Sequence, residues 1–148
     1  MLKGIDPLLN AEVLYALAAM GHGDDVIICD GNFPAHSVAA ETTFGQLLHI
    51  DVPAPEAVRA VLTILPLDEF VDDAAARMEV VDEPETLLPI MEEVQAEVTA
   101  AGGPTLVGVE RFDFYDRAKN AFAVIQALEP RFYGCFALRK GVIPPDEN

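Results

Sequence analysis

Four polar side chains stand out because their types and positions suit proton transfer and ligand binding. His22 lies in the stretch MGHGDDVIICDGNFPAH, just after a predicted helix. An imidazole is the side chain that most easily gives and takes protons near neutral pH. Asp30 follows the apolar run VIIC, Arg111 follows TLVGVE, and Tyr133 opens YGCFAL. These residue types indicate a site for acid–base chemistry on a bound ligand.

His22 also has a purely structural interpretation. Gly21 is expected to end the preceding helix in a left-handed conformation, so that Gly-His-Gly forms a flexible C-cap with a solvated histidine. The spacing of these residues alone favours this interpretation. In contrast, the negative end of the helix dipole would favour the protonated ring of His22, which suits a general acid.

The other three side chains have structural alternatives of the same kind. Asp30 could bond the backbone of its own DGN turn, as an aspartate after a strand often does. Arg111 could pair with Asp113, a predicted helix N-cap, with Asp116, or with another of the many carboxylates of the chain. Tyr133 could be an interior aromatic residue whose hydroxyl is satisfied within the protein.

Several further residues are interpreted as structural. His36 follows Pro34, His49 alternates within LLHI, and Asp68 in PLDEF is typical of a cap. Cys29 and Cys135 lie in strand-like runs without CxxC spacing, so we expect reduced thiols and no structural zinc site. The chain has no GxGxxG, GxxxxGK[ST] or GxSxG motif, and nucleotide chemistry and serine hydrolysis therefore lack support.

Composition narrows the class of partner. With 148 residues, of which 51% are hydrophobic, the chain is expected to form one domain over residues 1–148. Its net charge of −16 argues against nucleic acid and anionic membranes as partners. No apolar run approaches the roughly 20 residues of a transmembrane helix, and no signal peptide is evident at the N-terminus. We expect a soluble, cytoplasmic protein.

The apolar pattern predicts alternating helices and strands, with Asn10 capping the first helix. In chain order we expect a helix at 11–20, strands at 26–29 and 47–50 with a loop between them, a helix from about 55, a strand at 77–81, a helix at 84–101 containing Pro89, a strand at 105–109, a helix at 114–128 and a strand at 133–138.

Near-continuous apolar strands between amphipathic helices predict a sheet that is covered on both faces. The expected fold is therefore a three-layer α/β domain with a central, mixed sheet. In open α/β sheets, ligands bind beyond the carboxyl ends of the strands. Asp30 and Arg111 should meet at that edge if their strands are parallel, whereas the sequence does not place His22 at either edge.

Three stretches together resemble the ribose pyranase / fucose mutarotase family: MGHGDDVIICDGNFPAH, RFDFYDRAKNAFAV and YGCFALRKG. The resemblance is greatest to the fucose mutarotase branch, and residues 51–100 contribute no motif to it. It implies an α/β subunit that forms a ring-like or smaller homo-oligomer, with sugar sites near the subunit contacts. It also implies interconversion of sugar ring forms without a cofactor.

The resemblance implies roles for three of the polar residues. His22 would be the proton donor and Asp30 a sugar-contacting carboxylate, and Arg111 matches the arginine of the family's RFxFY motif. From their chemistry, we expect Arg111 to donate to a ring or hydroxyl oxygen and Tyr133 to present a hydroxyl and a flat apolar face to the sugar. Opening a pyranose hemiacetal requires a proton at the ring oxygen and loss of a proton from the anomeric hydroxyl. The expected substrate is an unphosphorylated monosaccharide, L-fucose or a related pyranose, because a net charge of −16 would repel a phosphate.

The sequence departs from the family pattern near its end. The family's YGN motif falls on Tyr133, Gly134 and Cys135, so that a thiol replaces an amide in the implied binding site. A thiol is a weak donor and acceptor, whereas an amide is good at both, and the change could alter sugar preference. A protein that binds a monosaccharide without converting it, or a D-ribose pyranase, is therefore also compatible with the sequence.

Overall fold

Helices and strands alternate along the computed structural model, which describes residues 1–147 and leaves Asn148, the last residue of the predicted domain, outside the described part. The helices are α1 (Ala11–Ala19), α2 (Ala35–Ala39), α3 (Ala54–Leu62), α4 (Pro89–Ala100) and α5 (Arg111–Lys119). The strands are β1 (Asp25–Cys29), β2 (Leu47–Ile50), β3 (Ala75–Met78), β4 (Val107–Val109), β5 (Ala123–Ala127) and β6 (Phe136–Arg139).

The strands form one six-stranded sheet in the order β2-β5-β1-β6-β3-β4. β6 pairs antiparallel with both β1 and β3, while the pairs β1–β5, β2–β5 and β3–β4 are parallel. All strands except β6 therefore run in one direction, and the predicted mixed sheet of a single α/β domain is confirmed.

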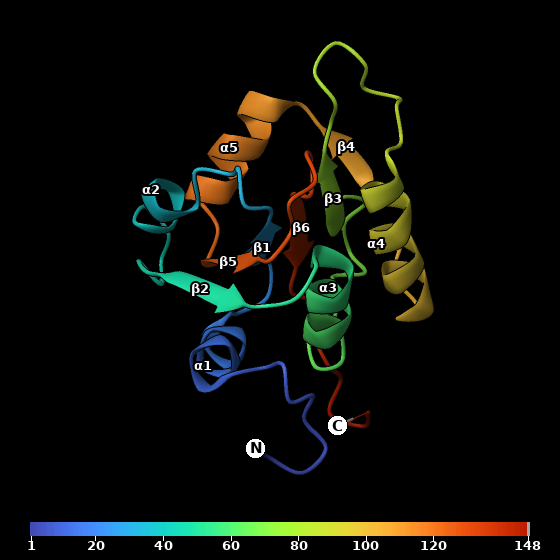
Figure 1. Cartoon of the computed structure of the whole chain (residues 1–148). Coiled ribbons are helices and arrows are strands. Elements are labelled where there is room, and N and C mark those ends of the chain that lie inside the picture. The colour runs from blue at the N-terminus through green and yellow to red at the C-terminus, as the bar shows by residue number, and fades with distance from the viewer. Residues whose placement is uncertain (148) are drawn as a thin grey trace.

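Helices cover both faces of this sheet (Figure 1), as the apolar strands predict. Successive side chains of β1 point to opposite faces. Val26 and Ile28 pack in the core beneath α1, α3 and α4, whereas Ile27 and Cys29 pack in the second core beneath α2 and α5. The domain thus has two apolar cores, one on each side of the sheet, and the predicted three layers are present.

The predicted helix at 114–128 is wrong in its second half. Helix α5 ends at Lys119, and residues Ala123–Ala127 form β5, which lies between β1 and β2. The run AVIQA is apolar at nearly every position because the strand is buried on both faces. A short apolar run of this kind has the periodicity of neither a helix nor an alternating strand, and here pairing on both sides decides the conformation.

Smaller differences concern the boundaries of elements. The helix predicted at 84–101 begins at Pro89, since proline fits the first turn of a helix, where its missing N–H is not needed. The strand predicted at 77–81 lies at Ala75–Met78. The expected loop after β1 contains the short helix α2, which follows Pro34. The strands predicted at 105–109 and 133–138 begin later, at Val107 and Phe136, while the strands at 26–29 and 47–50 and the Asn10 cap, which accepts a hydrogen bond from the Val13 N–H at 3.0 Å, are confirmed.

We expect Ile125→Ala to lower the free energy of unfolding by about 2–5 kcal/mol, because the residue is fully buried in a strand that is paired on both sides. Leu128→Ala is the matched control, because Leu128 is 62% exposed just beyond the same strand and should change stability by no more than about 0.5 kcal/mol. Urea unfolding measures both values, and equal losses would contradict an interior position for β5.

Candidate functional site

The Asp30 carboxylate is the centre of the contacts at the carboxyl end of β1. One oxygen, Oδ1, accepts hydrogen bonds from the backbone N–H groups of Asn32 at 2.8 Å and Phe33 at 3.0 Å. The other, Oδ2, accepts from the Gly134 N–H at 3.0 Å and from the Cys135 thiol at 3.5 Å. Asp30 is only 3% exposed, so these donors replace water around it. The contacts with Asn32 and Phe33 match the structural alternative, a carboxylate that bonds its own turn.

A second buried carboxylate, that of Glu129, fixes the loop that leads from β5 to β6. It is 2% exposed and accepts hydrogen bonds from the backbone N–H and the guanidinium of Arg131, with Nε at 2.8 Å, and from the Ala54 N–H at 3.3 Å. Its backbone carbonyl accepts from the Gly31 N–H at 2.9 Å. Burial raises the pKa of Glu129, but the hydrogen bonds and charge of Arg131 outweigh it and hold this pKa below its ordinary value.

The backbone of this loop is tightly constrained at Tyr133 and Gly134. A Cβ atom on Gly134 would lie 2.9 Å from Cγ of Glu129 and 3.2 Å from Cβ of Asp30, so the position has room only for glycine. Tyr133 has a φ of 61°, a left-handed conformation that costs a bulky residue about 1–3 kcal/mol. Its hydroxyl accepts a hydrogen bond from the Val81 N–H at 3.2 Å, as expected for a satisfied aromatic residue.

Helix α5 begins at Arg111 and brings this side chain to the same edge of the sheet. Glu110 is the N-cap, and its Oε2 accepts from the N–H groups of Phe112 at 2.8 Å and Asp113 at 3.2 Å. The prediction of Asp113 as the cap is therefore wrong by one turn. A carboxylate at either position would suit the positive end of a helix, and the backbone conformation at Glu110 decides between them.

The guanidinium of Arg111 lies against aromatic rings. Its Nε donates to the Tyr115 hydroxyl at 3.1 Å, and its Cζ lies 5.4 Å from the centre of the Tyr115 ring and 5.5 Å from that of Phe112. The hydrogen bond to Tyr115 raises the pKa of Arg111. Within residues 1–147 it forms no ion pair, so the alternative pairing with Asp113 or Asp116 is not observed.

A cavity of about 260 Å³ lies where these groups converge. Its walls combine polar groups, aromatic rings and sulfur atoms, from Asp30, Asn32, Phe33, Met78, Arg111, Tyr115, Phe132, Tyr133 and Cys135. Four of the six predicted site residues line it, namely Asp30, Arg111, Tyr133 and Cys135. Gly134 does not line it but donates its N–H to Asp30, and His22 is not part of it. The sequence interpretation missed Phe33 and Tyr115, although Tyr115 lies one helical turn from Arg111 and could have been found by that spacing.

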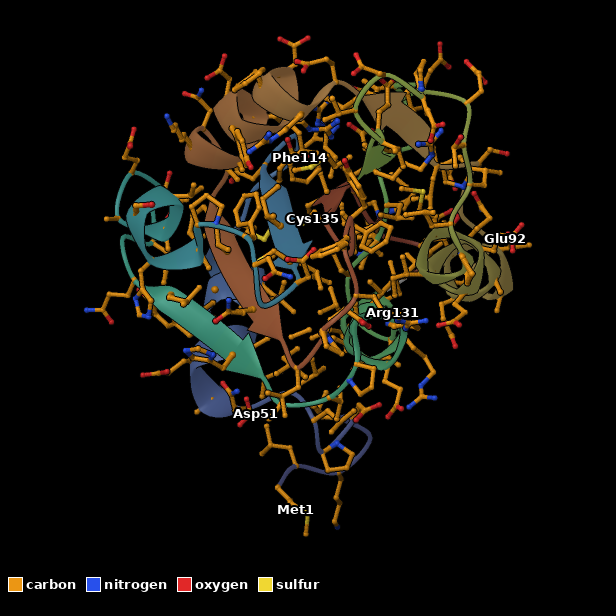
Figure 2. The ribbon with its side chains drawn as sticks, turned by 45° about the horizontal axis from the view of Figure 1, so that its top comes forward. Met1, Asp51, Glu92, Phe114, Arg131 and Cys135 are labelled. Carbon is orange, nitrogen blue, oxygen red and sulfur yellow. The ribbon has the colours of Figure 1, made fainter. Side chains whose placement is uncertain are left out.

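The sulfur of Cys135 belongs to the interior of the protein. Figure 2 shows Cys135 in the middle of the molecule near Phe114, with which it shares the core beneath α2 and α5, while Glu92 lies at the outer edge. Burial, and then the negative charge of Asp30, raise the pKa of Cys135, and burial likewise raises that of Cys29. Both cysteines are free thiols, as predicted.

His22 lies at the opposite end of β1 from Asp30, in the turn that leads from α1 into the strand. The left-handed residue of this turn is Gly23, with a φ of 87°, so the prediction for Gly21 is wrong. Lys140 places its Nζ 2.7 Å from the Leu17 carbonyl oxygen and 2.6 Å from that of Met20. This ammonium group satisfies the end of α1, and the helix dipole is therefore not the main electrostatic partner of His22.

The partner of His22 is Asp68, a residue 46 positions away in the sequence. Nε2 of His22 lies 3.1 Å from Oδ2 of Asp68, and the two side chains are 47% and 3% exposed. Oδ1 of Asp68 accepts from the Phe70 N–H at 3.0 Å, which confirms the predicted capping role. This hydrogen bond, together with the contact to His22, holds the pKa of Asp68 below its ordinary value despite some loss of hydration.

One subunit thus separates the two groups on which the expected acid–base chemistry depends. β1 contains five residues, which extend about 17 Å at the usual rise of a strand. His22 precedes the strand and does not line the cavity that contains Asp30 and Arg111.

Among residues 1–147, no three histidine, cysteine, aspartate or glutamate side chains are grouped as a metal site requires. The helices of this part of the chain are also too short or too polar to span a bilayer.

Comparison with known proteins agrees with this fold. Residues 3–143 match the model of the RbsD / FucU transport protein family. The chain belongs to this family. Fucose mutarotase of Danio rerio is 42% identical over 154 residues, which cover 100% of this chain and 98% of that protein.

Two solved structures of the family are also similar. The structure of a proposed sugar-binding protein has a TM-score of 0.94 and 55% identity, with 97% of both chains covered. The fucose mutarotase of Streptococcus pneumoniae, solved in complex with L-fucose, has a TM-score of 0.86 and 32% identity, with 97% of this chain and 100% of that chain covered. The family that the three sequence stretches resemble is therefore confirmed.

We expect Glu129→Gln to lower the free energy of unfolding at neutral pH by about 1.5–3 kcal/mol, the range for hydrogen bonds to a charged group. Because the pKa of Glu129 is lower in the folded chain, its stabilising effect is complete above the unfolded value of about 4.3 and is lost as the pH falls through the folded value. Urea unfolding between neutral and acidic pH should show the difference between wild type and variant shrink in acid.

Glu93→Gln is the matched control, because Glu93 pairs with the same Arg131 but is 48% exposed. Its effect should stay below about 1 kcal/mol at every pH. A stability difference for Glu129→Gln that does not change with pH would show that the charge of Glu129 is not what fixes this loop.

Proposed function

We propose that this protein is a sugar mutarotase, which interconverts the anomers of an unphosphorylated monosaccharide by acid–base ring opening. The observation that carries the proposal is the cavity in which the Arg111 guanidinium faces aromatic rings and a buried carboxylate. Its volume of about 260 Å³ lies below the roughly 300–1,000 Å³ of pockets for drug-sized ligands, which suits a single sugar ring.

The walls of this cavity offer what a sugar ring needs. Only Nε of Arg111 is bonded within residues 1–147, so both terminal nitrogens remain as donors for a ring or hydroxyl oxygen. The rings of Phe33, Tyr115 and Tyr133 provide apolar surface for the C–H groups of a pyranose. The strained backbone at Tyr133 supports a functional role for this loop, because such strain persists where the surrounding structure enforces it.

The proton donor in this proposal is His22 of a second copy of the chain. Within one copy His22 and the cavity lie at opposite ends of β1, and both ends carry exposed apolar side chains. Phe70 and Ile143 lie at the His22 end, and Phe112 and Phe132 lie at the cavity end. A head-to-tail contact would cover both surfaces and bring an imidazole to the sugar, and repetition of such a contact closes a ring or extends a filament.

The reaction requires only proton transfers. A proton passes from His22 to the ring oxygen, the anomeric hydroxyl gives one to a water molecule, and the C1–O5 bond opens to the free aldehyde. Rotation about the C1–C2 bond followed by closure on the other face gives the opposite anomer. Asp30 is surrounded by protein donors and holds the shape of the cavity, while its remaining lone pairs could accept from a sugar hydroxyl. Positioned acid–base groups accelerate such steps by about 10²–10⁴-fold.

We expect His22→Ala to slow anomer exchange of L-fucose by about 10²–10⁴-fold, because it removes the proton donor, while sugar binding largely survives. Two-dimensional NMR exchange spectroscopy measures the rate, and titration of the sugar signals measures binding. An unchanged exchange rate would remove His22 from the mechanism. If wild type shifts the sugar signals without accelerating exchange, the protein is a monosaccharide binder and the proposed activity is wrong.

Mixing variants tests whether each site combines two copies. His22→Ala and Arg111→Ala should each exchange anomers slowly alone. When the two variants are mixed in equal amounts after mild dissociation, about a quarter of the subunit contacts should regain activity. These contacts join a copy with intact His22 to a copy with intact Arg111. No recovery after demonstrated subunit exchange would contradict a composite site.

For Cys135→Asn we expect a change in sugar preference with little loss of the exchange reaction, because an amide would bond both Asp30 and a sugar hydroxyl where the thiol bonds only Asp30. Exchange rates of parent and variant for L-fucose, D-ribose and related sugars provide the comparison, with Cys29→Ala as the buried thiol control. Identical preferences would show that residue 135 does not select the sugar. Faster exchange of D-ribose than of L-fucose by the parent would favour the pyranase alternative.

A further inference from the structure

A buried carboxylate next to a half-exposed imidazole defines a second functional unit, at the His22 end of β1. We propose that Asp68 is a positioning residue, which holds Nε2–H of His22 and thereby makes Nδ1 the nitrogen that exchanges a proton with the sugar. This inference rests on the proposed role of His22 as proton donor. It adds a residue from a different part of the chain and assigns different tasks to the two ring nitrogens.

Asp68 is held rigidly in the fold. Its N–H donates to the Arg139 carbonyl at 3.0 Å, and its Oδ1 accepts from the Phe70 N–H at 3.0 Å. Gly141 passes so close that a Cβ atom there would lie 2.8 Å from the Asp68 Cα. With one oxygen bound to backbone, only Oδ2 faces His22. The carboxylate is therefore a fixed hydrogen-bond acceptor whose second oxygen is directed at the His22 ring.

The imidazole is held from two further sides. The Phe70 ring packs edge-on against it, with ring centres 5.7 Å apart. The turn that carries His22 is fastened by the Gly23 N–H, which donates to the Lys140 carbonyl at 2.9 Å, and by Asp24, whose carboxylate accepts from the Gly21 N–H at 2.7 Å. Side-chain and backbone contacts thus determine the orientation of a ring that remains 47% exposed.

The chemistry of Asp68 determines which ring nitrogen carries the permanent proton. An ionised carboxylate only accepts hydrogen bonds, so the neutral imidazole must keep its proton on Nε2, and its lone pair is then on Nδ1. When Nδ1 takes a proton, the same carboxylate stabilises the charged ring, as the aspartate does in serine protease triads. The positioned ring can therefore give and take a proton at one defined atom.

The other charged groups near this turn are already engaged. Arg139 lies beside Asp68 and pairs with Asp25 and Asp73, while the Lys140 ammonium bonds the carbonyls at the end of α1. The Asp24 carboxylate bonds its own turn. Within residues 1–147, Asp68 is the carboxylate in contact with the His22 ring.

We expect Asp68→Asn to slow anomer exchange by at least about tenfold, and by no more than His22→Ala slows it, which is roughly 10²–10⁴-fold. KM should be nearly unchanged. An asparagine amide can place either oxygen or nitrogen toward the ring, so it neither fixes the tautomer nor stabilises the charged form. Glu69→Gln is the matched control, because it removes the exposed carboxylate next to Asp68 in the sequence, whereas the ion pair of His22 is with Asp68, and it should leave exchange within about twofold.

Two readouts separate positioning from a general loss of structure. ¹⁵N NMR of the wild type at high pH should show the Nε2–H tautomer of neutral His22, and Asp68→Asn should show a mixture. Asp68→Asn combined with His22→Ala should be no slower than His22→Ala alone, because the carboxylate acts through the imidazole.

The outcomes distinguish this inference from the function on which it rests. If His22→Ala does not slow exchange, the proposed function fails. If His22→Ala slows exchange but Asp68→Asn does not, or if the double variant loses activity additively, only the role of Asp68 is wrong. A Nδ1–H tautomer in the wild type would overturn the inference even if Asp68→Asn does not fold.

Discussion

The architecture of the candidate site depends on one buried carboxylate. Asp30 directly follows β1 and accepts hydrogen bonds from the turn that it opens and from the loop that precedes β6. A charge at 3% exposure persists only if such donors replace its water, so both segments must adopt the conformation that presents them. The glycine at position 134 and the strained tyrosine before it are consequences of this requirement, because any side chain at 134 would meet Asp30 and Glu129.

The same strand explains why one subunit does not unite the two candidate groups. β1 lies in the middle of the sheet, with β5 on one side and β6 on the other, so its two ends lie at opposite edges of the sheet. Asp30, Arg111 and the cavity lie at its carboxyl end, whereas His22 and Asp68 lie at its amino end. In the proposed mutarotase the second copy of the chain is thus part of the active site, and assembly would control activity as well as stability.

Much of the fold could be predicted from the sequence, because long apolar runs and amphipathic helices report burial directly. The first helix, its Asn10 cap and the strands at 26–29 and 47–50 are examples. The strand Ala123–Ala127 was mistaken for the continuation of a helix, since five residues that are buried on both faces carry no periodicity. The convergence of Asp30 and Arg111 was predicted correctly because parallel strands place their carboxyl ends at one edge.

The sequence by itself determined the layered α/β class, the family and the residues that could carry chemistry, because these follow from local pattern and motif. Only the tertiary structure decided how those residues are grouped. It bonded Asp30 to the loop before β6, placed Tyr115 under Arg111, and joined His22 to a carboxylate from a segment 46 residues away. Side-chain contacts across such separations depend on how the sheet brings distant segments together, and neither propensity nor spacing along the chain records that arrangement.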